Sequence, residues 1–448
     1  MKKRRISLST TQIIMLSFLG LILLGSVLLS LPISATGGKA VPYLDALFTA
    51  TTATCVTGLV TVPTVSTWSI FGQAVILILI QIGGLGVITI ISAVMILLNK
   101  RMGIGNRLLL QDAFNLNSLS GIVNFVKRVM WGTFLVEGIG ALCYMPVFVP
   151  EFGWRGIWIS VFTSISAFCN AGIDIIAENS LCNYATNPIV NLNTALLIIL
   201  GGIGYIVWWD VLQTSRKRRR GFRHLTLHSK IAIVTTAILT FGGALLIFLF
   251  EYQNPLTIGN MSLFDKIQVS LFQSVTTRTA GFATVPQQDL TNASSILSLL
   301  LMFIGGSPVG TAGGVKTVTI AVLAVSAMAT IQNKHEVTLF DRHISKQAVK
   351  KSVAVIAMSF GIMFISTLLL SAVSSADTLD ILYETVSATA TVGLTRNLTP
   401  QLGNMGKIVI IGTMYLGRVG PISLALALNS SRKKTNIITH PTEEISVG

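Results

Sequence analysis

Four short glycine-containing segments carry the chemistry that this sequence of 448 residues most directly offers. The segments read TATCVTGLVTV, SAFCNAGIDI, TTRTAGFATV and SATATVGLTR, and they align on Gly58, Gly172, Gly281 and Gly393. Glycine allows backbone angles that other residues avoid, so successive carbonyl oxygens of such a segment can point toward one side. Carbonyl oxygens arranged around an axis can replace the water around a dehydrated cation. The four segments therefore predict main-chain ligands for a cation.

The spacing of these glycines predicts a repeated architecture. Successive glycines are 114, 109 and 112 residues apart, and a second landmark follows each of them by 24 to 29 residues. The second landmark lies in QIGGLG, ILGGIG, FIGGSP and YLGRVG, at Gly83, Gly201, Gly305 and Gly417. Near-constant spacing of this size is typical of repeated structural units. Each unit reads as an apolar helix, a short amphipathic helix, a glycine-containing loop and a second apolar helix.

The composition predicts a polytopic membrane protein, because 52% of the residues are hydrophobic and only 11% are charged. Windows of roughly 20 apolar residues, the length that crosses a bilayer, occur at Ile13–Leu31, Ala74–Leu98, Leu192–Trp209, Ile231–Phe250, Val353–Val373 and Ile408–Leu428. The start, MKKRR before an apolar run, resembles a secretory signal, but the run is long for one and we expect a transmembrane helix. The four cysteines show no metal or redox spacing and receive no function.

The basic residues predict the orientation of these spans. Of the 32 lysines and arginines, 24 cluster in the segments 2–5, 100–128, 216–230, 334–351 and 432–434. Basic loops mark the cytoplasmic side, so both termini are expected to be cytoplasmic. Each unit begins and ends at a basic cluster, which predicts parallel repeats and argues against the inverted-repeat transporter plan. The run Arg216–Arg220 favours a topology signal or contact with membrane lipids over binding of nucleic acid, despite the net charge of +15.

The short amphipathic helices are interpreted as pore helices that stop halfway through the membrane. Three open with an acid, Asp45, Asp265 or Asp380, which we expect to cap free amides at the positive helix end; the second, GIWISVFTSISAF, lacks one. The alternative is a helix on the membrane surface. A non-helical loop at membrane depth must be buried or line water, so four such loops predict one shared pore.

The loops, read as TVTGL-like, AFxNAGx, TTRTAGF and ATVGL, resemble those of the Ktr/Trk/HKT superfamily of potassium transporters over nearly the whole chain. The predicted eight spans, without an extra leading hairpin, are most similar to the Ktr membrane subunit (KtrB-like). The resemblance implies K+ bound at the carbonyls of the four glycines, in a selectivity filter made by Thr57, Gly58, Ala171, Gly172, Ala280, Gly281, Val392 and Gly393. Serine at the first glycine is the family substitution associated with Na+, so Gly58 favours K+.

The resemblance also implies partners and location. It predicts a multi-pass protein of the cell membrane that forms a homodimer and binds a cytosolic ring of nucleotide-binding RCK/KTN subunits. K+ is then the transported ion and Na+ an activator, and this chain binds no organic cofactor. Two residues of the loops stand out. Asp174 follows Gly172-Ile173 and either concentrates cations at the outer mouth or is a solvated loop acid. Arg278, within TTRTAGF, is interpreted as a scaffold residue that bonds filter-loop carbonyls or an acid.

The third unit carries an insert, GGSPVGTAGGVK, between two halves of an apolar span, whereas we expect the other second helices to be unbroken. In the resembling family this is the intramembrane gating loop, here Gly305, Gly306, Ser307, Pro308, Gly310, Thr311, Gly313, Gly314 and Lys316. Close packing of small residues is the structural alternative. A phosphate-binding loop is excluded, because Val315 separates Gly314 from Lys316 and an apolar span precedes the segment.

The fourth unit has Gly417-Arg418 where the others have Gly-Gly. An arginine within a span is a functional candidate by default. We hypothesise that Arg418 hydrogen-bonds carbonyls of the loop and repels cations in the closed state. Glu137 also lies in a predicted span, where a hydrogen bond on the packing side and an ion role are both open.

The predicted fold is an all-α polytopic membrane protein with four parallel M1–pore helix–M2 repeats, eight transmembrane helices, around one pseudo-fourfold pore. The expected divisions are repeat 1 at 1–105, repeat 2 at 106–224, repeat 3 with the broken second helix at 225–345, repeat 4 at 346–430 and a cytoplasmic tail at 431–448. The alternatives are a Na+-selective member of the superfamily and a Na+-coupled secondary transporter. An intramembrane enzyme is not expected, since no HExxH, Ser/Lys or paired-Asp site lies in the spans.

Overall fold

The computed structural model of the chain describes residues 9–98, 104–113, 121–216, 221–334 and 336–420. This part is helical apart from one antiparallel hairpin of β1 (Thr338–Leu339) and β2 (Arg342–His343). The basic residues predicted at 2–5, 217–220 and 432–434, the tail 431–448 and the end of the last predicted span at 421–428 lie outside the described residues.

Four helices of the described ranges are long and apolar enough to cross a membrane. They are α1 (Thr10–Leu29), α7 (Ile122–Phe152), α11 (Leu227–Glu251) and α15 (Lys346–Val373). Only 17 to 33% of their apolar windows is buried, and side chains such as Trp131 and Phe241 are exposed. Such an apolar outer surface suits hydrocarbon rather than water, because lipid tails solvate it without penalty.

A short helix, a loop and a further helix follow each long helix. The short helices are α2 (Tyr43–Cys55), α8 (Trp154–Phe168), α12 (Leu263–Thr276) and α16 (Thr378–Ala390). The helices after the loops are α4 (Ile70–Leu85), α9 (Pro188–Gly202), α13 (Asn292–Phe303) and α17 (Asn404–Val419). Smaller helices are α3 (Thr64–Thr67) and α6 (Ile104–Ala113).

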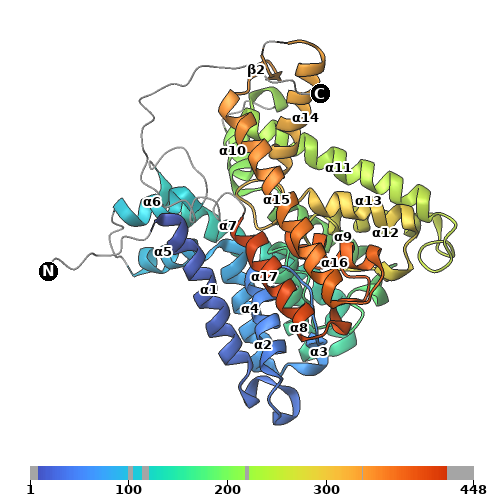
Figure 1. Cartoon of the computed structure of the whole chain (residues 1–448). Helices are drawn as coiled ribbons and strands as arrows, with labels where there is room; N and C mark the ends of the chain where they lie inside the picture. Colours follow the sequence, from blue (N-terminus) through green and yellow to red (C-terminus); the bar gives the residue numbers. More distant parts are fainter. Residues whose placement is uncertain (1–8, 99–103, 114–120, 217–220, 335, 421–448) are drawn as a thin grey trace.

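These elements pack in a cycle. α4 contacts α8, α9 contacts α12, α13 contacts α16, and α17 contacts α2, so each post-loop helix supports the short helix of the next unit. Figure 1 shows the last of these contacts, where the red α17 lies beside the blue helices from the start of the chain. The cycle therefore brings four loops that are distant in sequence to one centre.

The expectation of unbroken second helices outside the third unit is wrong for the first two units. The chain bends by 94° between α4 and α5 (Val87–Leu97), and by 94° between α9 and α10 (Tyr205–Arg216). The bends occur at Gly86 and Gly204, whose φ angles of 86° and 93° lie in the left-handed region that glycine adopts without strain. In the third unit, α13 ends at Phe303, α14 spans Thr317–Ile331, and residues 304–316 between them are non-helical.

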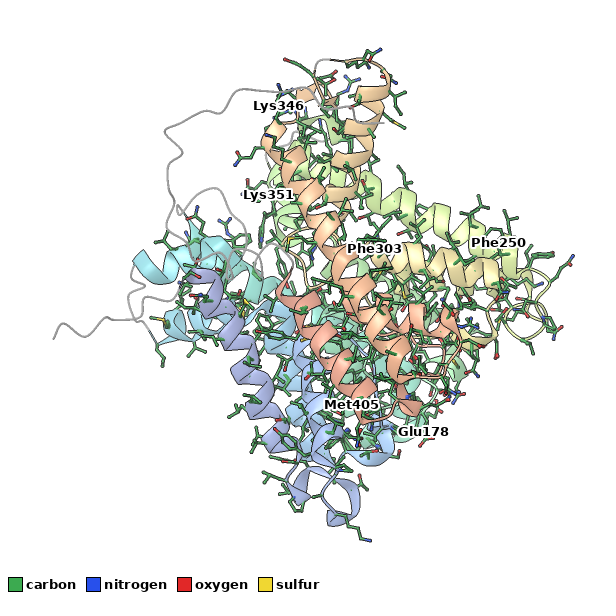
Figure 2. All side chains as sticks on the ribbon, viewed as in Figure 1. Glu178, Phe250, Phe303, Lys346, Lys351 and Met405 are labelled. Atoms are coloured by element: carbon green, nitrogen blue, oxygen red, sulfur yellow. The ribbon has the colours of Figure 1, made fainter. Side chains whose placement is uncertain are left out.

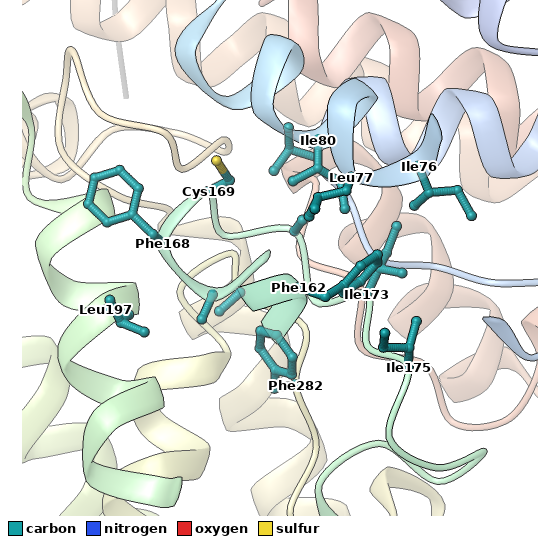
Figure 3. Packing of buried hydrophobic residues seen from close by; sticks show 14 of the residues in the cluster. Ile76, Leu77, Ile80, Phe162, Phe168, Cys169, Ile173, Ile175, Leu197 and Phe282 are labelled. Carbon is teal, nitrogen blue, oxygen red and sulfur yellow. The ribbon is translucent and has the colours of Figure 1, made fainter. Parts of the chain in front are cut away.

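One of the apolar clusters of the core lies where α4, α8 and α9 meet. Figure 3 shows Ile76 and Ile80 of α4, Phe162 and Phe168 of α8 and Leu197 of α9 around the loop residues Ile173, Ile175 and Phe282. Phe282 belongs to the third loop but packs in the same cluster as the second loop. Burial of these side chains thus fixes two neighbouring loops against each other.

The two ends of the molecule differ in charge. Figure 2 shows Lys346 and Lys351 at one end and Glu178 and Met405 at the other, with Phe303 between them. The end that carries Lys346 and Lys351 is called the basic end below. Helix α3, in the loop after α2, and Glu178, in the loop after α8, lie toward the opposite end (Figures 1 and 2).

Candidate functional site

The four aligned glycines form a closed ring at the centre of the molecule. A Cβ added to Gly58 would lie 2.6 Å from the carbonyl oxygen of Ala171, and one on Gly281 would lie 2.5 Å from that of Val392. Added Cβ atoms on Gly172 and Gly393 would likewise overlap the carbonyl oxygens of the next loop in cyclic order, those of Ala280 and Thr57. The ring therefore has no room for a side chain at any of the four positions.

The loops share one backbone pattern at the ring. The φ angles of the glycines are 103°, 64°, 86° and 98° in chain order. Two residues before each glycine, a non-glycine residue also has positive φ, and these are Val56, Asn170, Thr279 and Thr391. The residue between the two does not have a positive φ. Such alternation turns successive peptide planes so that their carbonyl groups can face one side of the segment.

The carbonyl oxygens of the ring are unused acceptors. Thr57, Ala171, Ala280 and Val392 are fully buried, at 0% exposure. Within the described ranges, no hydrogen bond reaches their carbonyl oxygens or those of the four glycines. Because nearly all buried carbonyls in folded proteins are paired, a ring of carbonyls without a protein partner is a candidate set of main-chain ligands. Uncharged oxygen dipoles arranged in a ring suit a monovalent cation.

Hydroxyl groups of the short helices brace the ring from behind. Thr52 Oγ1 accepts from the N–H of Gly58 at 2.9 Å, and Ser387 Oγ accepts from the N–H of Gly393 at 3.0 Å. In the other two loops, Ser166 and Thr276 bond carbonyl groups instead. Sequence reasoning missed these four residues, although a serine or threonine stands five or six residues before each glycine.

The predicted capping role of Asp45 is wrong. Among the described residues no side chain caps α2, and Asp45 is its third residue. Its Oδ1 instead accepts from Lys407 Nζ at 2.5 Å and from Thr61 Oγ1 at 2.8 Å. Lys407 lies in α17, so a full charge from the last unit competes better for this carboxylate than the helix amides do. The pair ties the first unit to the fourth.

The capping role of Asp380 is wrong for the same reason. Its Oδ1 accepts from Arg396 Nε at 2.7 Å. Arg396 also donates through Nη1 to the carbonyl of Gln287 at 3.2 Å and to Ser295 Oγ at 2.7 Å. One guanidinium thus joins the fourth loop to α16, to the third loop and to α13. Asp265 accepts from Ser262 Oγ, whose hydroxyl caps α12.

Two other charged residues lie away from the ring. Arg278 is buried and donates to the carbonyl of Thr236 in α11 at 3.4 Å. Its partner is therefore neither a filter-loop carbonyl nor an acid, because the side chain points back toward the long helix. Glu137 in α7 accepts from Gln81 Nε2 of α4 at 3.2 Å. The hydrogen bonds of its carboxylate, with Gln81 and Cys169, are on the packing side and do not reach the ring.

A cavity of about 360 Å³ opens on the side of the ring away from the basic end. It is lined by the four glycines together with Asp174, Glu178 and Gln287. Asp174 is half-buried and lies outside the membrane-spanning helices. Burial raises its pKa to about 6, while hydrogen bonds from Ser180 and from two backbone N–H groups act in the opposite direction. The carboxylate therefore lines the approach to the ring and titrates just below neutral pH.

The non-helical segment 304–316 lies directly under the ring on its other side. Thr311 Oγ1 is 3.0 Å from both the carbonyl oxygen of Phe168 and Asn170 Oδ1. A Cβ on Gly313 would overlap Thr391 Oγ1. Asn170 and Thr391 are the positive-φ residues just before the ring, so the segment packs against the second and fourth loops beneath the ring.

Backbone bonds attach this segment to the bend between α9 and α10. Ser307 N–H donates to Gly202 O at 2.8 Å, and Thr311 N–H donates to Gly201 O at 3.1 Å. In return, Tyr205 N–H donates to Val309 O at 2.9 Å. Lys316 Nζ donates to Ala312 O at 2.6 Å and holds the end nearer α14. Several backbone groups that the break leaves free are thus satisfied by the neighbouring unit.

Arg418 joins the segment to two further helices. Its Nη1 donates to Thr311 O at 2.7 Å, and its Nη2 donates to Gly83 O at 2.5 Å. These bonds link α17, the 304–316 segment and the end of α4. Beside them lies a second cavity of about 340 Å³, lined by residues 83–89, part of the segment and Arg418. The structure therefore brings Arg418 and the loop together, while gating by this contact stays a prediction.

The comparison with protein families is decisive for the class of this protein. The chain matches the family TrkH, cation transport protein, over residues 6–436. It belongs to the TrkH family. Members of the family are ion transporters and not enzymes, as the sequence predicted, and the helical, polytopic membrane architecture agrees with this assignment.

Individual relatives extend the family assignment. The chain is 39% identical to Ktr system potassium uptake protein B of Bacillus subtilis (strain 168), over 98% of this chain and 96% of that protein. It is 38% identical to potassium/sodium uptake protein NtpJ of Enterococcus hirae, over 100% of this chain and 99% of that protein. Its fold is similar to the crystal structure of the potassium transporter TrkH from Vibrio parahaemolyticus, with a TM-score of 0.76, 17% identity, and coverage of 96% and 86%.

Proposed function

We propose that this TrkH-family chain is the K+-translocating membrane subunit of a bacterial-type K+ uptake system. The observation that carries the proposal is the closed ring of four positive-φ glycines with buried, unpaired carbonyl oxygens. Such oxygens replace the water around a K+ ion at little cost, because they are held in place before the ion arrives. The names of the relatives, which are uptake proteins for potassium or for potassium and sodium, support the same ion class.

The pore of this proposal runs through the centre of four parallel M1–pore helix–M2 repeats with the boundaries predicted from the sequence. The repeated order of helices and their cyclic packing support this arrangement. The C-terminal ends of α2, α8, α12 and α16 lead into the ring, so their partial negative charge favours a cation there. The eight membrane passes then comprise the four long helices and the second apolar segment of each unit, which is α4 with α5, α9 with α10, α13 with α14, and α17.

The orientation follows from charge. Lys346 and Lys351 mark the basic end, which we place in the cytoplasm by the positive-inside rule. The cavity that contains Asp174 then faces the outside, and the 304–316 segment and Arg418 face the cytoplasm. Ions would enter past a carboxylate and leave past a guanidinium.

In this proposal the 304–316 segment is the gate, and the hydrogen bonds of Arg418 hold it in the closed position. The segment lies under the ring, and the guanidinium beside it repels a cation that leaves the ring. A cytosolic ring of nucleotide-binding RCK/KTN subunits would move the basic end and release the segment, and the membrane subunit would work as a homodimer. The membership of two relatives in Ktr systems supports a multi-subunit assembly.

The alternative within the family is a Na+-selective transporter, and a Na+-coupled secondary transporter is the alternative outside this mechanism. Gly58 in the ring favours K+, with Na+ acting as an activator. The name of the Enterococcus hirae relative includes sodium, which favours a test of Na+ transport as well. Rapid, channel-like flux through the protein in liposomes would exclude alternating access.

Uptake measurements in cells that lack their own K+ transport test the proposal. The wild-type chain is expected to restore growth and uptake at low K+ over a range of Na+ concentrations. Gly58→Ser is expected to shift uptake toward Na+, since it removes the family's K+-associated glycine. Uptake of Na+ without K+ by the wild-type chain would contradict the assignment.

A further inference from the structure

The four loops are of two kinds, which differ in how a hydroxyl group of the preceding short helix bonds the loop backbone. In the first and fourth loops, the hydroxyl of the short helix accepts a hydrogen bond from the N–H of the ring glycine. The acceptors are Thr52 and Ser387. In these two loops the hydroxyl leaves every carbonyl group near the ring untouched.

In the second and third loops the hydroxyl donates a hydrogen bond to a carbonyl group instead. Ser166 Oγ donates to the carbonyl of Ile173 at 2.5 Å, and Thr276 Oγ1 donates to the carbonyl of Phe282 at 2.6 Å. Ile173 and Phe282 are the residues immediately after the ring glycines. Both bonds are short and fully buried, so they are strong constraints on the direction of the two carbonyl groups.

The matching carbonyl groups of the other two loops are free. Leu59 and Leu394 stand immediately after Gly58 and Gly393 and are 0% and 1% exposed. Within the described parts of the chain, no hydrogen bond reaches their carbonyl oxygens. The layer of carbonyls on the Asp174 side of the ring therefore contains two free oxygens and two that are bonded to helices behind the loops.

We propose that Ser166 and Thr276 determine the ion specificity of this outer layer by withdrawing two of its four carbonyl groups from the pore axis. The inference rests on the proposed function. An ion in this layer would be held by the carbonyls of Leu59 and Leu394 and would keep water on its other side. A half-set of carbonyls discriminates less between K+ and Na+ than a full set, because selectivity depends on the number of coordinating dipoles.

The charge distribution around the mouth fits this division. The second and third loops are neighbours in the cycle, so the two withdrawn carbonyls lie on one half of the ring. Asp174 belongs to the second loop, two residues after Gly172, and lines the cavity on that half. A carboxylate thus supplies negative potential where carbonyl dipoles have been removed.

The test uses Thr276→Val, which keeps the shape of the side chain and removes the donor. In Rb+ or K+ uptake by the full chain, KM is expected to fall by about fivefold and inhibition by Na+ to weaken by about the same factor, as one further dipole is worth about 1 kcal/mol. Thr276→Ser keeps the hydroxyl and is expected to restore the wild-type KM and the wild-type inhibition by Na+. Thr52→Val removes an acceptor from the Gly58 N–H, so its KM is expected to rise instead.

Equal KM and equal Na+ inhibition in the wild type and Thr276→Val would overturn the inference, as would the same direction of change in Thr276→Val and Thr52→Val. Ser166→Ala repeats the test in the second loop if Thr276→Val does not reach the membrane. Failure of the proposed function is a different result, because the wild-type chain itself would then carry no K+.

Discussion

The ring and the 304–316 segment are both non-helical chain at the centre of the bundle, but they are held in different ways. Each loop of the ring is fixed by its own short helix, through bonds that span five to seven residues, such as Thr52 to Gly58. The 304–316 segment is fixed by distant parts of the chain, such as Gly201, Phe168 and Arg418. Local bonds suit the fixed geometry that the proposed filter needs, whereas the proposed gate is held by contacts that would be released if the other units moved.

The carbonyl groups of the two regions also differ in whether they are hydrogen-bonded. In the ring they are unpaired and available to an ion. In the segment, Thr311 O is taken by Arg418, Ala312 O by Lys316, and Val309 O by the N–H of Tyr205. The ring therefore offers ligands to a cation, while the segment offers few and brings a positive charge. Under the proposed function, this difference would let one pore both select and block.

The sharpest way to break the ring is to add one methyl group. Gly393→Ala forces a Cβ onto the carbonyl of Thr57 at a φ of 98°, and uptake is expected to fall about 100-fold or more, since strain and lost geometry cost about 3 kcal/mol. Initial rates of K+ uptake, normalised to protein in the membrane, measure the effect. Gly412→Ala is the control, because its Cβ would meet no atom within 4 Å. Normal uptake by Gly393→Ala would show that the ring is not the filter.

Substitution of Arg418 tests whether the 304–316 segment is a gate. Arg418→Ala leaves the carbonyls of Thr311 and Gly83 unpaired and removes a positive charge beneath the ring. Flux through the isolated subunit is expected to rise about tenfold, which corresponds to a barrier lower by about 1.4 kcal/mol. Flux into proteoliposomes is the measurement, with Arg418→Lys as the variant that keeps the charge. Unchanged or reduced flux would contradict a gating role. Replacement of Gly310–Gly314 by a helix-forming stretch should also alter gating.

Loss of the ion pair between Arg396 and Asp380 is expected to have a smaller effect on uptake, confined to the ring. Arg396→Gln removes the ion pair with Asp380, whose side chains are only 13% and 28% exposed, and the loss is expected to be about 1–3 kcal/mol of local stability. K+/Na+ selectivity should decrease several-fold while the response to Arg418→Ala persists. The melting temperature of the purified protein gives a second readout. Lys350→Gln, at an exposed position of α15, is the control.

The smallest effect is expected at the mouth. Above its pKa of about 6, Asp174 is negative and attracts cations, and below that pH it becomes neutral. The KM for K+ should therefore rise about twofold to threefold as the pH falls from 7 to 5, the effect of one partly screened charge. Asp174→Asn should have the higher KM at both pH values. A pH step that survives in Asp174→Asn would assign it to another group.

The sequence by itself determined the membrane class and the TrkH-type pattern, because composition and a spacing of about 110 residues are visible without any three-dimensional information. It also located the chain break in the third unit, since an insert with glycines and a proline cannot continue a helix. It did not reveal the bends after α4 and α9, because a single glycine can continue a helix as well as end it.

Tertiary structure alone decided the partners. Asp45 and Lys407 are 362 residues apart, and Arg418 reaches Gly83 across 335 residues, so no local pattern could have paired them. Of the acids expected to cap helices, Asp45 pairs with a lysine of another unit and Asp380 with an arginine of its own unit. Arg278 turned toward α11. Whether a hydroxyl donates or accepts was equally hidden. Ser166 and Ser387 are the same residue at the same place in the repeat, and only the orientation of the neighbouring peptide gives them opposite roles.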